Sequence, residues 1–251
     1  MLRVESDGPV LRVTLDRPEV RNAFNGELVQ ALRDAFEGMG KEVRAVVLAG
    51  EGKTFCAGGD LNWMREAADY TEQQNYEDAL KLAALFDSLV EARAVVICKV
   101  HGAAFGGGCG LVAASDVAIA AEGTKFAFSE VKLGLIPATI SPHVIPKIGH
   151  GHARHLFATA EVFDAAHAVN IGLVHFAVSA ENLDEEVEKR VAMVLSGGPD
   201  AVASAKHVAV NGPYSSEESA RLLAKARSSD EGKEGVAAFL DKRKASFVVD
   251  K

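Results

Sequence analysis

Two glycine-rich segments, each directly after an apolar run, hold the residue types that can bind a developing negative charge. The first is Phe55–Leu61, which reads Phe-Cys-Ala-Gly-Gly-Asp-Leu and follows Ala45–Leu48. The second is Phe105–Leu111, which reads Phe-Gly-Gly-Gly-Cys-Gly-Leu and follows Ala94–Ile97. Turns of such small residues between a strand and a helix leave backbone N–H groups free to point at one atom. The pair therefore predicts a group of N–H donors for an oxyanion.

A third segment, Ser129–Pro137, supplies a carboxylate that can move protons beside these donors. Its Glu130 follows the apolar tripeptide Phe126-Ala127-Phe128. Apolar surroundings disfavour the charged carboxylate, so they raise its pKa toward the working range of a general acid or base. The alternative is an ordinary surface carboxylate at the start of a helix.

Other motifs do not meet the spacing that their chemistry requires. Gly52-Lys53-Thr54 ends like a phosphate-binding loop, but that loop needs a glycine where Val47 stands. Gly106–Gly108 is not a dinucleotide fingerprint, because Leu111 occupies the place of its last glycine. The histidines at positions 150, 152 and 155 have no acidic partner at metal-site spacing. We therefore expect no metal ion.

The elements that position these segments alternate between strand and helix patterns. Thr71 and Gln74 fit a capping box, and Ser141 is expected to be the N-cap of a helix with Pro142 at its first position. Strands are expected at 10–15, 44–48, 95–100, 116–120, 125–128 and 173–178, and helices at 26–38, at 71–92, through 112–114, from 141, and throughout the chain after 182. This order predicts an α/β core, residues 1–195, followed by a helical module, residues 196–251.

The composition is that of an ordinary globular chain with an acidic surface. Its 251 residues include 27 Lys or Arg and 35 Asp or Glu, so the net charge of −8 opposes binding to nucleic-acid phosphates. The apolar runs are too short for a transmembrane helix, and the first residues do not resemble a signal or transit peptide. The three cysteines, Cys56, Cys98 and Cys109, lack metal-ligand spacing and predict reduced thiols in the cytoplasm.

Several segments, in the same order and at the same spacing, make the chain resemble the crotonase (enoyl-CoA hydratase/isomerase) family over nearly its whole length. They are Asp16–Asn25, Phe55–Leu61, His101–Leu111, Ser115-Asp116, Phe128–Pro137, Gly149 and Glu231–Phe247. The resemblance implies a spiral of ββα units followed by a C-terminal helical module that builds a homotrimer or homohexamer. It also implies an acyl-CoA substrate and no cofactor, since coenzyme A is part of the substrate.

The same resemblance implies roles for individual residues. The N–H groups of Ala57 and Gly107 would polarise the thioester carbonyl, and Glu130 would transfer the proton at the acyl α and β carbons. Gly107 would admit a close approach of the thioester because it has no Cβ. The residues expected to bind the substrate are Arg21, Ala23, Gly58, Gly59, Asp60, Leu61, Pro137, His143, Lys147, Phe239 and Lys242. Of these, Asp60 is expected mainly to cap the following helix, and Phe239 and Lys242 to reach the nucleotide of a neighbouring subunit.

Gly110 departs from the pattern of the two-carboxylate hydratases, which carry a glutamate at this position. Three reactions therefore stay open. The first is hydration through Glu130 alone, and the second is Δ3-Δ2 enoyl-CoA isomerisation, which needs one base. The third is another thioester reaction, such as hydrolysis or a retro-aldol cleavage. We expect the hydratase and keep the isomerase as the alternative.

The acyl group is suggested by Ala138–Pro142 together with Gly106–Leu111, which look like the corresponding segments of bacterial methylglutaconyl-CoA hydratases of leucine and isoprenoid breakdown. Substrates of those enzymes carry a second carboxylate. His143 and Lys147, one helical turn apart, are the expected partners of that carboxylate. We therefore expect a branched, dicarboxylic enoyl-CoA.

RNA binding, known in the methylglutaconyl branch, is a function of a different class. It would need a lysine-rich helical face. Residues 27–41 offer only Arg33 and Lys41 against Glu27, Asp34 and Glu37. These charges oppose RNA binding, so we expect no nucleic-acid partner and no membrane partner.

Overall fold

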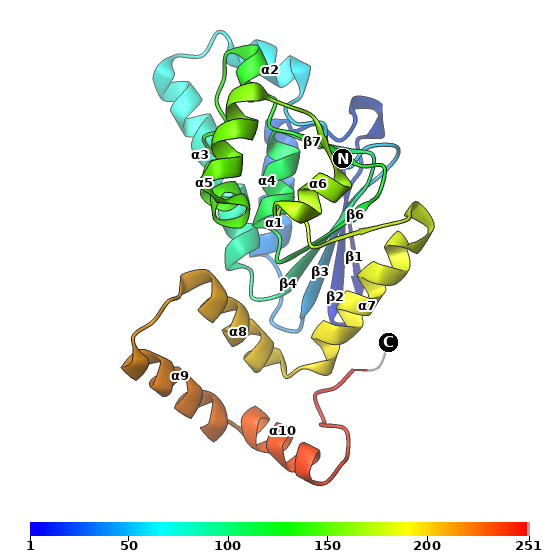
Figure 1. Cartoon of the computed structure of the whole chain (residues 1–251), viewed down its shortest axis with the longest axis vertical. Coiled ribbons are helices and arrows are strands. Elements are labelled where there is room, and N and C mark those ends of the chain that lie inside the picture. Colours follow the sequence, from blue (N-terminus) through cyan, green and yellow to red (C-terminus); the bar gives the residue numbers. More distant parts are fainter. Residues whose placement is uncertain (250–251) are drawn as a thin grey trace.

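Two β-sheets form the centre of the molecule in the computed structural model, which describes residues 1–249 (Figure 1). The larger sheet has the strand order β1 (Leu2–Asp7), β2 (Val10–Leu15), β3 (Ala45–Gly50), β4 (Val95–Val100), β6 (Val117–Ala121) and β9 (Phe176–Val178). Strand β1 is antiparallel to β2, and the other neighbours are parallel. The smaller sheet consists of β5 (Ala103–Phe105), β7 (Lys125–Ala127) and β8 (Phe163–Asp164).

The chain repeats an order of strand, second strand and helix. Strand β4 continues into β5 and α4 (Gly107–Ala114), and β6 continues into β7, the short helix η2 (Glu130–Leu133) and α5 (Ser141–Thr159). In the two earlier repeats the second strand is reduced to a single bridge. Cys56 pairs with Ala104 before α2 (Leu61–Ala67), and Phe24 pairs with Gly59 before α1 (Gly26–Glu37). This arrangement confirms the expected α/β spiral of ββα units.

Buried apolar side chains cover both faces of the larger sheet. Along β3, Val46 and Leu48 contribute to one core, whereas Ala45 and Val47 contribute to the other. This alternation is the one that a fully buried parallel strand requires. The first core packs against α1, α3 (Glu72–Glu91) and α4, and the second packs against α7 (Leu183–Ser196) (Figure 1).

Three C-terminal helices, α8 (Pro199–Asn211), α9 (Ser216–Ser228) and α10 (Asp230–Leu240), extend away from the sheets (Figure 1). The expected boundary at residue 195 lies in the last turn of α7, and residues 250–251 of the expected module lie outside the described residues.

Arg44, just before β3, contacts both the end of α7 and the C-terminal segment. Its guanidinium donates to the carbonyls of Phe247 at 2.8 Å and Val194 at 3.2 Å, and also to that of Gly197.

Most expected elements are present, but two helix starts differ from the expectation. Thr71 and Gln74 form the expected capping box. Ser141, in contrast, is the first residue of α5 rather than its N-cap, because its hydroxyl donates to the carbonyl of Ala138 at 2.8 Å. Helix α4 begins at Gly107, earlier than its glycine-rich sequence suggested, because burial of the helix outweighs the low helix propensity of glycine. Helix α2 confirms the helix expected after Asp60. The elements β1, β5, β8, α6 (Ala165–Asn170), η1 (Pro18–Val20) and η3 (Ala180–Asn182) were not expected.

Lys206 on α8 attaches the C-terminal helices to the larger sheet through a buried ion pair. Its Nζ lies 2.8 Å from Oδ2 of Asp116, which also accepts from the N–H of Val96 at 2.7 Å. The same Nζ donates to the carbonyls of Leu89 at 3.2 Å and Ala94 at 3.0 Å. The Lys206 side chain is only 8% exposed.

We expect Lys206→Ala to lower the free energy of unfolding by about 3–5 kcal/mol, because the buried carboxylate of Asp116 loses its partner. Lys225→Ala, on the exposed surface of α9, is the matched control and should change this free energy by less than about 0.5 kcal/mol. Urea unfolding of both variants, followed by circular dichroism, measures the difference. Equal effects of the two substitutions would contradict the attachment role of Lys206.

Candidate active site

The first glycine-rich turn joins β3 to α2 and lies against the loop before α1. The N–H of Phe24 donates to the carbonyl of Gly58 at 2.7 Å, and the N–H of Asp60 donates to the carbonyl of Phe24 at 2.7 Å. Successive peptide groups of an extended segment point to opposite sides. The N–H of Gly59 therefore points away from Phe24, and no hydrogen bond within residues 1–249 uses it as a donor.

This pairing corrects the expected donor. The N–H of Ala57 donates to the carbonyl of Arg21 at 3.0 Å, so it is already occupied within the protein. Gly59 has the free N–H and keeps solvent access, whereas Gly58 is buried. The sequence does contain a signal for Gly59, since it directly precedes Asp60, the residue that caps the next helix.

The second glycine-rich turn joins β5 to α4. Gly106 is the N-cap of α4 with a left-handed φ of 50°, a conformation that favours glycine, and its N–H donates to the carbonyl of Ala127 at 2.9 Å. Gly107 is the first residue of α4, so its N–H has no acceptor inside the helix. It is partly exposed, whereas Gly106 and Gly108 are buried. The second turn thus also presents one N–H, at the positive end of a helix dipole.

The two turns lie in direct contact. The N–H of Phe105 donates to the carbonyl of Cys56 at 3.0 Å. A Cβ atom on Gly108 would lie 2.6 Å from that same carbonyl oxygen, and one on Gly58 would lie 3.1 Å from the carbonyl oxygen of Phe105. Side chains at these two positions would therefore push the turns apart, so the glycines keep the Gly59 and Gly107 segments adjacent.

The carboxylate of Glu130 lies beside the start of α4. A Cβ atom on Gly106 would lie 3.2 Å from its Oε1. Its Oε2 is buried and has no hydrogen-bond partner within the described part of the chain. Burial raises the pKa of Glu130 above the ordinary glutamate value, and its own backbone N–H opposes this shift more weakly. An unpartnered buried carboxylate oxygen is available to accept a proton or to hold a water molecule.

Apolar side chains fill the space beside Gly110. A Cβ atom there would lie 2.5 Å from Cγ2 of Ile140 and 2.7 Å from both Cε1 and Cζ of Phe86. Both of these side chains are buried. The position therefore excludes a glutamate side chain unless its neighbours move, and the glycine leaves room for Phe86 and Ile140.

The two residues expected to bind a second substrate carboxylate differ in their surroundings. The Nζ of Lys147 donates to the carbonyls of Ser115 at 2.7 Å and Val112 at 3.4 Å, and burial lowers the pKa of Lys147 to about 8. Its ammonium group thus binds the C-terminal end of α4, the opposite end from Gly107, and the expectation for Lys147 is wrong. His143 lies closer to Gly110, because its ring packs on Phe86 with centroids 5.8 Å apart.

His143 also contacts a carboxylate of the protein. Its Nε2 lies 3.5 Å from Oδ1 of Asp87. Burial lowers the pKa of His143, and the nearby Asp87 opposes this shift more weakly. The neutral ring still carries one N–H that can donate a hydrogen bond.

Asp60 and Ala23 are both engaged within the protein. One oxygen of Asp60 accepts from the N–H of Asn62 at 2.8 Å, and the other lies 2.8 Å from the guanidinium of Arg17. These contacts lower the pKa of Asp60, and the bond from Asn62 has the largest effect. The expected capping role is confirmed, and because both carboxylate oxygens have partners within the protein, the structure does not support the expected substrate contact. Ala23 is also buried. Its carbonyl accepts from the guanidinium of Arg17 at 2.6 Å, and its N–H donates to the carbonyl of Val20 at 3.2 Å, so the structure does not support its contact with the substrate.

The remaining expected binding residues do not form one cluster within this chain. Pro137 is buried, whereas Arg21 and Leu61 are exposed. Phe239, on α10, is 82% exposed, and Lys242 follows it at the end of that helix. Helices α2 and α10 lie at opposite ends of the molecule (Figure 1), so Phe239 and Lys242 do not reach Leu61 in one chain. Their contact with a neighbouring subunit's nucleotide stays a prediction.

Comparisons with known proteins extend over almost the whole chain. The sequence profile of the enoyl-CoA hydratase/isomerase family matches residues 5–249. The crotonyl-CoA hydratase of Syntrophomonas wolfei is 32% identical over 254 residues, covering 98% of this chain and 96% of that protein. The structure of AtuE from Pseudomonas aeruginosa has a TM-score of 0.95 and 36% identity, covering 99% of each chain. An enoyl-CoA hydratase from Shewanella pealeana has a TM-score of 0.93 and 36% identity, covering 98% of this chain and 95% of its own.

We expect Gly110→Glu to lower the free energy of unfolding by more than about 3 kcal/mol, because the new side chain overlaps Phe86 and Ile140 and brings a charge into an apolar environment. Gly123→Glu is the matched control, since a Cβ there meets no atom within 4 Å. Urea unfolding measures both variants and the double variant Phe86→Ala/Gly110→Glu. The double variant should be more stable than the sum of the single effects predicts. Strict additivity would show that Phe86 does not exclude the side chain.

Proposed function

Because this chain belongs to the enoyl-CoA hydratase/isomerase family, we propose that it adds water to the C2=C3 double bond of an enoyl-CoA thioester. One observation carries the proposal. Two turns in contact each present one free N–H, from Gly59 and Gly107, beside the unpartnered carboxylate of Glu130. Relatives named as hydratases favour hydration over the isomerase alternative.

In the proposed reaction, the thioester oxygen of the substrate accepts hydrogen bonds from Gly59 and Gly107. Water adds its oxygen to C3, and the electron pair of the double bond moves through C2 to the thioester oxygen, which becomes an enolate. The two N–H groups stabilise this charge as it develops, which is where such donors contribute most. When the enolate returns its electron pair, C2 takes up a proton and the 3-hydroxyacyl thioester is formed.

Glu130 performs both proton transfers in this scheme. Its carboxylate takes the proton that water loses as the C3–O bond forms, and it then gives a proton to C2. A second carboxylate cannot project from position 110, because Phe86 and Ile140 occupy that space. The burial of Glu130 suits this double role, since it raises the pKa of the side chain toward neutral pH. The carboxylate is then a stronger base, and its protonated form is still populated near the working pH.

For the acyl group we propose a branched dicarboxylic enoyl-CoA of the 3-methylglutaconyl type, which would place the enzyme in leucine catabolism. The proposal rests on the sequence around Ala138–Pro142. His143 is the candidate partner of the distal carboxylate, because it packs on Phe86 next to Gly110. Lys147 is not, since its ammonium group is bound at the far end of α4.

We also propose that the chain works as a homotrimer or homohexamer. Large apolar side chains on α9 and α10 are exposed in the single chain: Leu223 by 52%, Val236 by 60%, Phe239 by 82% and Leu240 by 71%. Side chains of this kind on adjacent helices favour burial against a second copy.

Three further expectations remain predictions: a cytoplasmic location, no nucleic-acid partner, and no cofactor beyond the CoA of the substrate. The cysteines Cys56, Cys98 and Cys109 are buried free thiols. Within residues 1–249, no helix is long and apolar enough to cross a membrane.

The function is tested by hydration of crotonyl-CoA and 3-methylglutaconyl-CoA, followed by the loss of the conjugated thioester absorbance. We expect Glu130→Gln to lower kcat by about 10²–10⁴-fold without a change in fold, because an amide cannot carry the proton. The wild-type rate should rise with pH through a single ionisation above the ordinary glutamate pKa of about 4.3, since the carboxylate must be charged to act as a base. Full activity of Glu130→Gln would refute the role of Glu130.

The acyl group is tested by His143→Leu, assayed with both substrates. We expect kcat/KM for 3-methylglutaconyl-CoA to fall by about 10-fold or more, because one charged hydrogen bond is lost. The value for crotonyl-CoA, which has no second carboxylate, should change by less than about 3-fold. Equal losses with the two substrates would argue against recognition of the second carboxylate by His143.

A further inference from the structure

Asn22 lies in a strained part of the loop between β2 and α1. It has a left-handed φ of 55°, as does the preceding Arg21, and neither residue is a glycine. Two consecutive left-handed residues persist only where their surroundings hold them, although asparagine tolerates this conformation better than most residues. The Asn22 side chain is completely buried.

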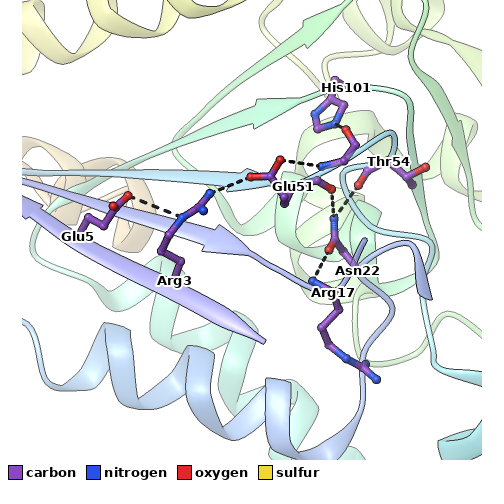
Figure 2. Close-up of polar contacts among 8 residues, drawn as sticks. Arg3, Glu5, Arg17, Asn22, Glu51, Thr54 and His101 are labelled. Carbon is purple, nitrogen blue, oxygen red and sulfur yellow. Dashed lines mark hydrogen bonds and ion pairs between the residues drawn. The ribbon is translucent and has the colours of Figure 1, made fainter. Parts of the chain in front are cut away.

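Every polar atom of the Asn22 side chain has a partner within the protein (Figure 2). Its Nδ2 donates to the carbonyls of Glu51 at 2.9 Å and Thr54 at 2.7 Å, and its Oδ1 accepts from the N–H of Arg17 at 2.9 Å. Glu51 and Thr54 are the residues on either side of the short turn at Gly52 and Lys53, just before Phe55. Asn22 therefore fixes the entry to the first glycine-rich segment.

The backbone on both sides of Asn22 fixes the rest of that segment. The carbonyl of Arg21 accepts from the N–H of Ala57, and Phe24 pairs with Gly58 and Asp60 as described above. The left-handed turn at Arg21 and Asn22 directs this backbone alongside Ala57–Asp60. The direction of the Gly59 N–H thus depends on the conformation of Asn22.

Arg17 secures the far end of the same pairing. Its Nη1 donates to the carbonyl of Ala23 at 2.6 Å, and its Nη2 lies 2.8 Å from Oδ2 of Asp60. Ala23 and Asp60 stand next to the bridged residues Phe24 and Gly59. The guanidinium therefore joins the two strands of the bridge just beside the free N–H.

From these contacts we infer that Asn22 and Arg17 are positioning residues for the reaction, which orient the Gly59 N–H toward the thioester oxygen. The inference rests on the proposed function. Neither side chain touches the substrate, because the contacts of Asn22 are all internal and Arg17 is bound to Ala23 and Asp60. These two side chains affect the geometry of a hydrogen-bond donor. Their substitution should therefore lower kcat rather than weaken the binding of the CoA.

Asn22→Gly tests Asn22 directly, since glycine adopts the left-handed conformation without strain while the three side-chain hydrogen bonds are lost. We expect kcat to fall by about 10–100-fold, because a small displacement of a catalytic group has effects of this size, while KM changes by less than about 3-fold. Asn22→Asp keeps the size of the side chain but loses both donated hydrogen bonds, and should lose at least as much activity. Arg17→Lys keeps a positive charge near Asp60 but cannot bind the Ala23 carbonyl and the Asp60 carboxylate at the same time in the geometry of the guanidinium, so it should also lower kcat.

A spectroscopic measurement distinguishes an effect on the geometry of the Gly59 N–H from an effect on the stability of the fold. Butyryl-CoA has no double bond to hydrate, and the stretching frequency of its thioester carbonyl falls when strong hydrogen bonds form to the oxygen. We expect the wild-type protein to lower this frequency, and the Asn22 and Arg17 variants to lose part of that shift. Val191→Ala, in the core on the α7 side of the sheet, is the control variant that destabilises the fold and should keep both the shift and kcat.

Each outcome has a definite meaning. If the variants keep the wild-type carbonyl shift and kcat while their melting temperatures fall, Asn22 and Arg17 have only a structural role and the inference is wrong. If the wild-type protein itself neither shifts the carbonyl nor hydrates either enoyl-CoA, the proposed function fails, and the inference fails with it. If the variants at Asn22 do not fold, Arg17→Lys decides by the same two measurements.

Discussion

The contact between the two glycine-rich turns is the constraint on which the rest of this site depends. A backbone N–H can serve a bound oxygen only if its own chain does not use it and no side chain stands in front of it. The N–H groups of Gly59 and Gly107 meet these conditions. The neighbouring Gly58 and Gly108 let the turns approach each other, because a Cβ on them would lie 3.1 Å and 2.6 Å, respectively, from a carbonyl oxygen of the opposite turn. The spiral of strands and helices then serves to bring β3 beside β4, which continues into β5, so that the turns after β3 and β5 meet.

The same close packing leaves a single unpartnered buried carboxylate beside the two turns within residues 1–249. Phe24 lies against Gly107, and Phe86 and Ile140 lie against Gly110, so one side of α4 is sealed by apolar side chains. Glu130 approaches from the other side, over Gly106, with one oxygen lacking a partner. An unpartnered buried carboxylate oxygen is costly for stability. The role that we propose for Glu130, exchange of a proton with the substrate, offsets this cost, while the packing of Phe86 and Ile140 against Gly110 leaves no room for a second carboxylate there.

The sequence predicted the fold class, the two turns and the position of Glu130, because glycine runs after β-branched strands are strong local signals. It misplaced the first donor, since whether Ala57 or Gly59 has the free N–H depends on pairing with Phe24, more than thirty residues away in the chain. The sequence predicted correctly that Lys147 lies one helical turn after His143, but not that its ammonium group binds the carbonyls at the C-terminal end of α4. The positioning role that we propose for Asn22 was not predicted. That proposal depends on hydrogen bonds from its side chain to Glu51 and Thr54, which a single sequence does not reveal.

In the proposed complex, one thioester oxygen binds between the N–H groups of Gly59 and Gly107. A crystal structure of the protein with bound butyryl-CoA, which resembles the substrate but cannot be hydrated, tests it most directly. We expect this oxygen to lie about 2.7–3.1 Å from both nitrogens, with the Glu130 carboxylate facing C2 and C3. An oxygen bound instead to the N–H of Ala57, or placed out of reach of either glycine, would contradict it.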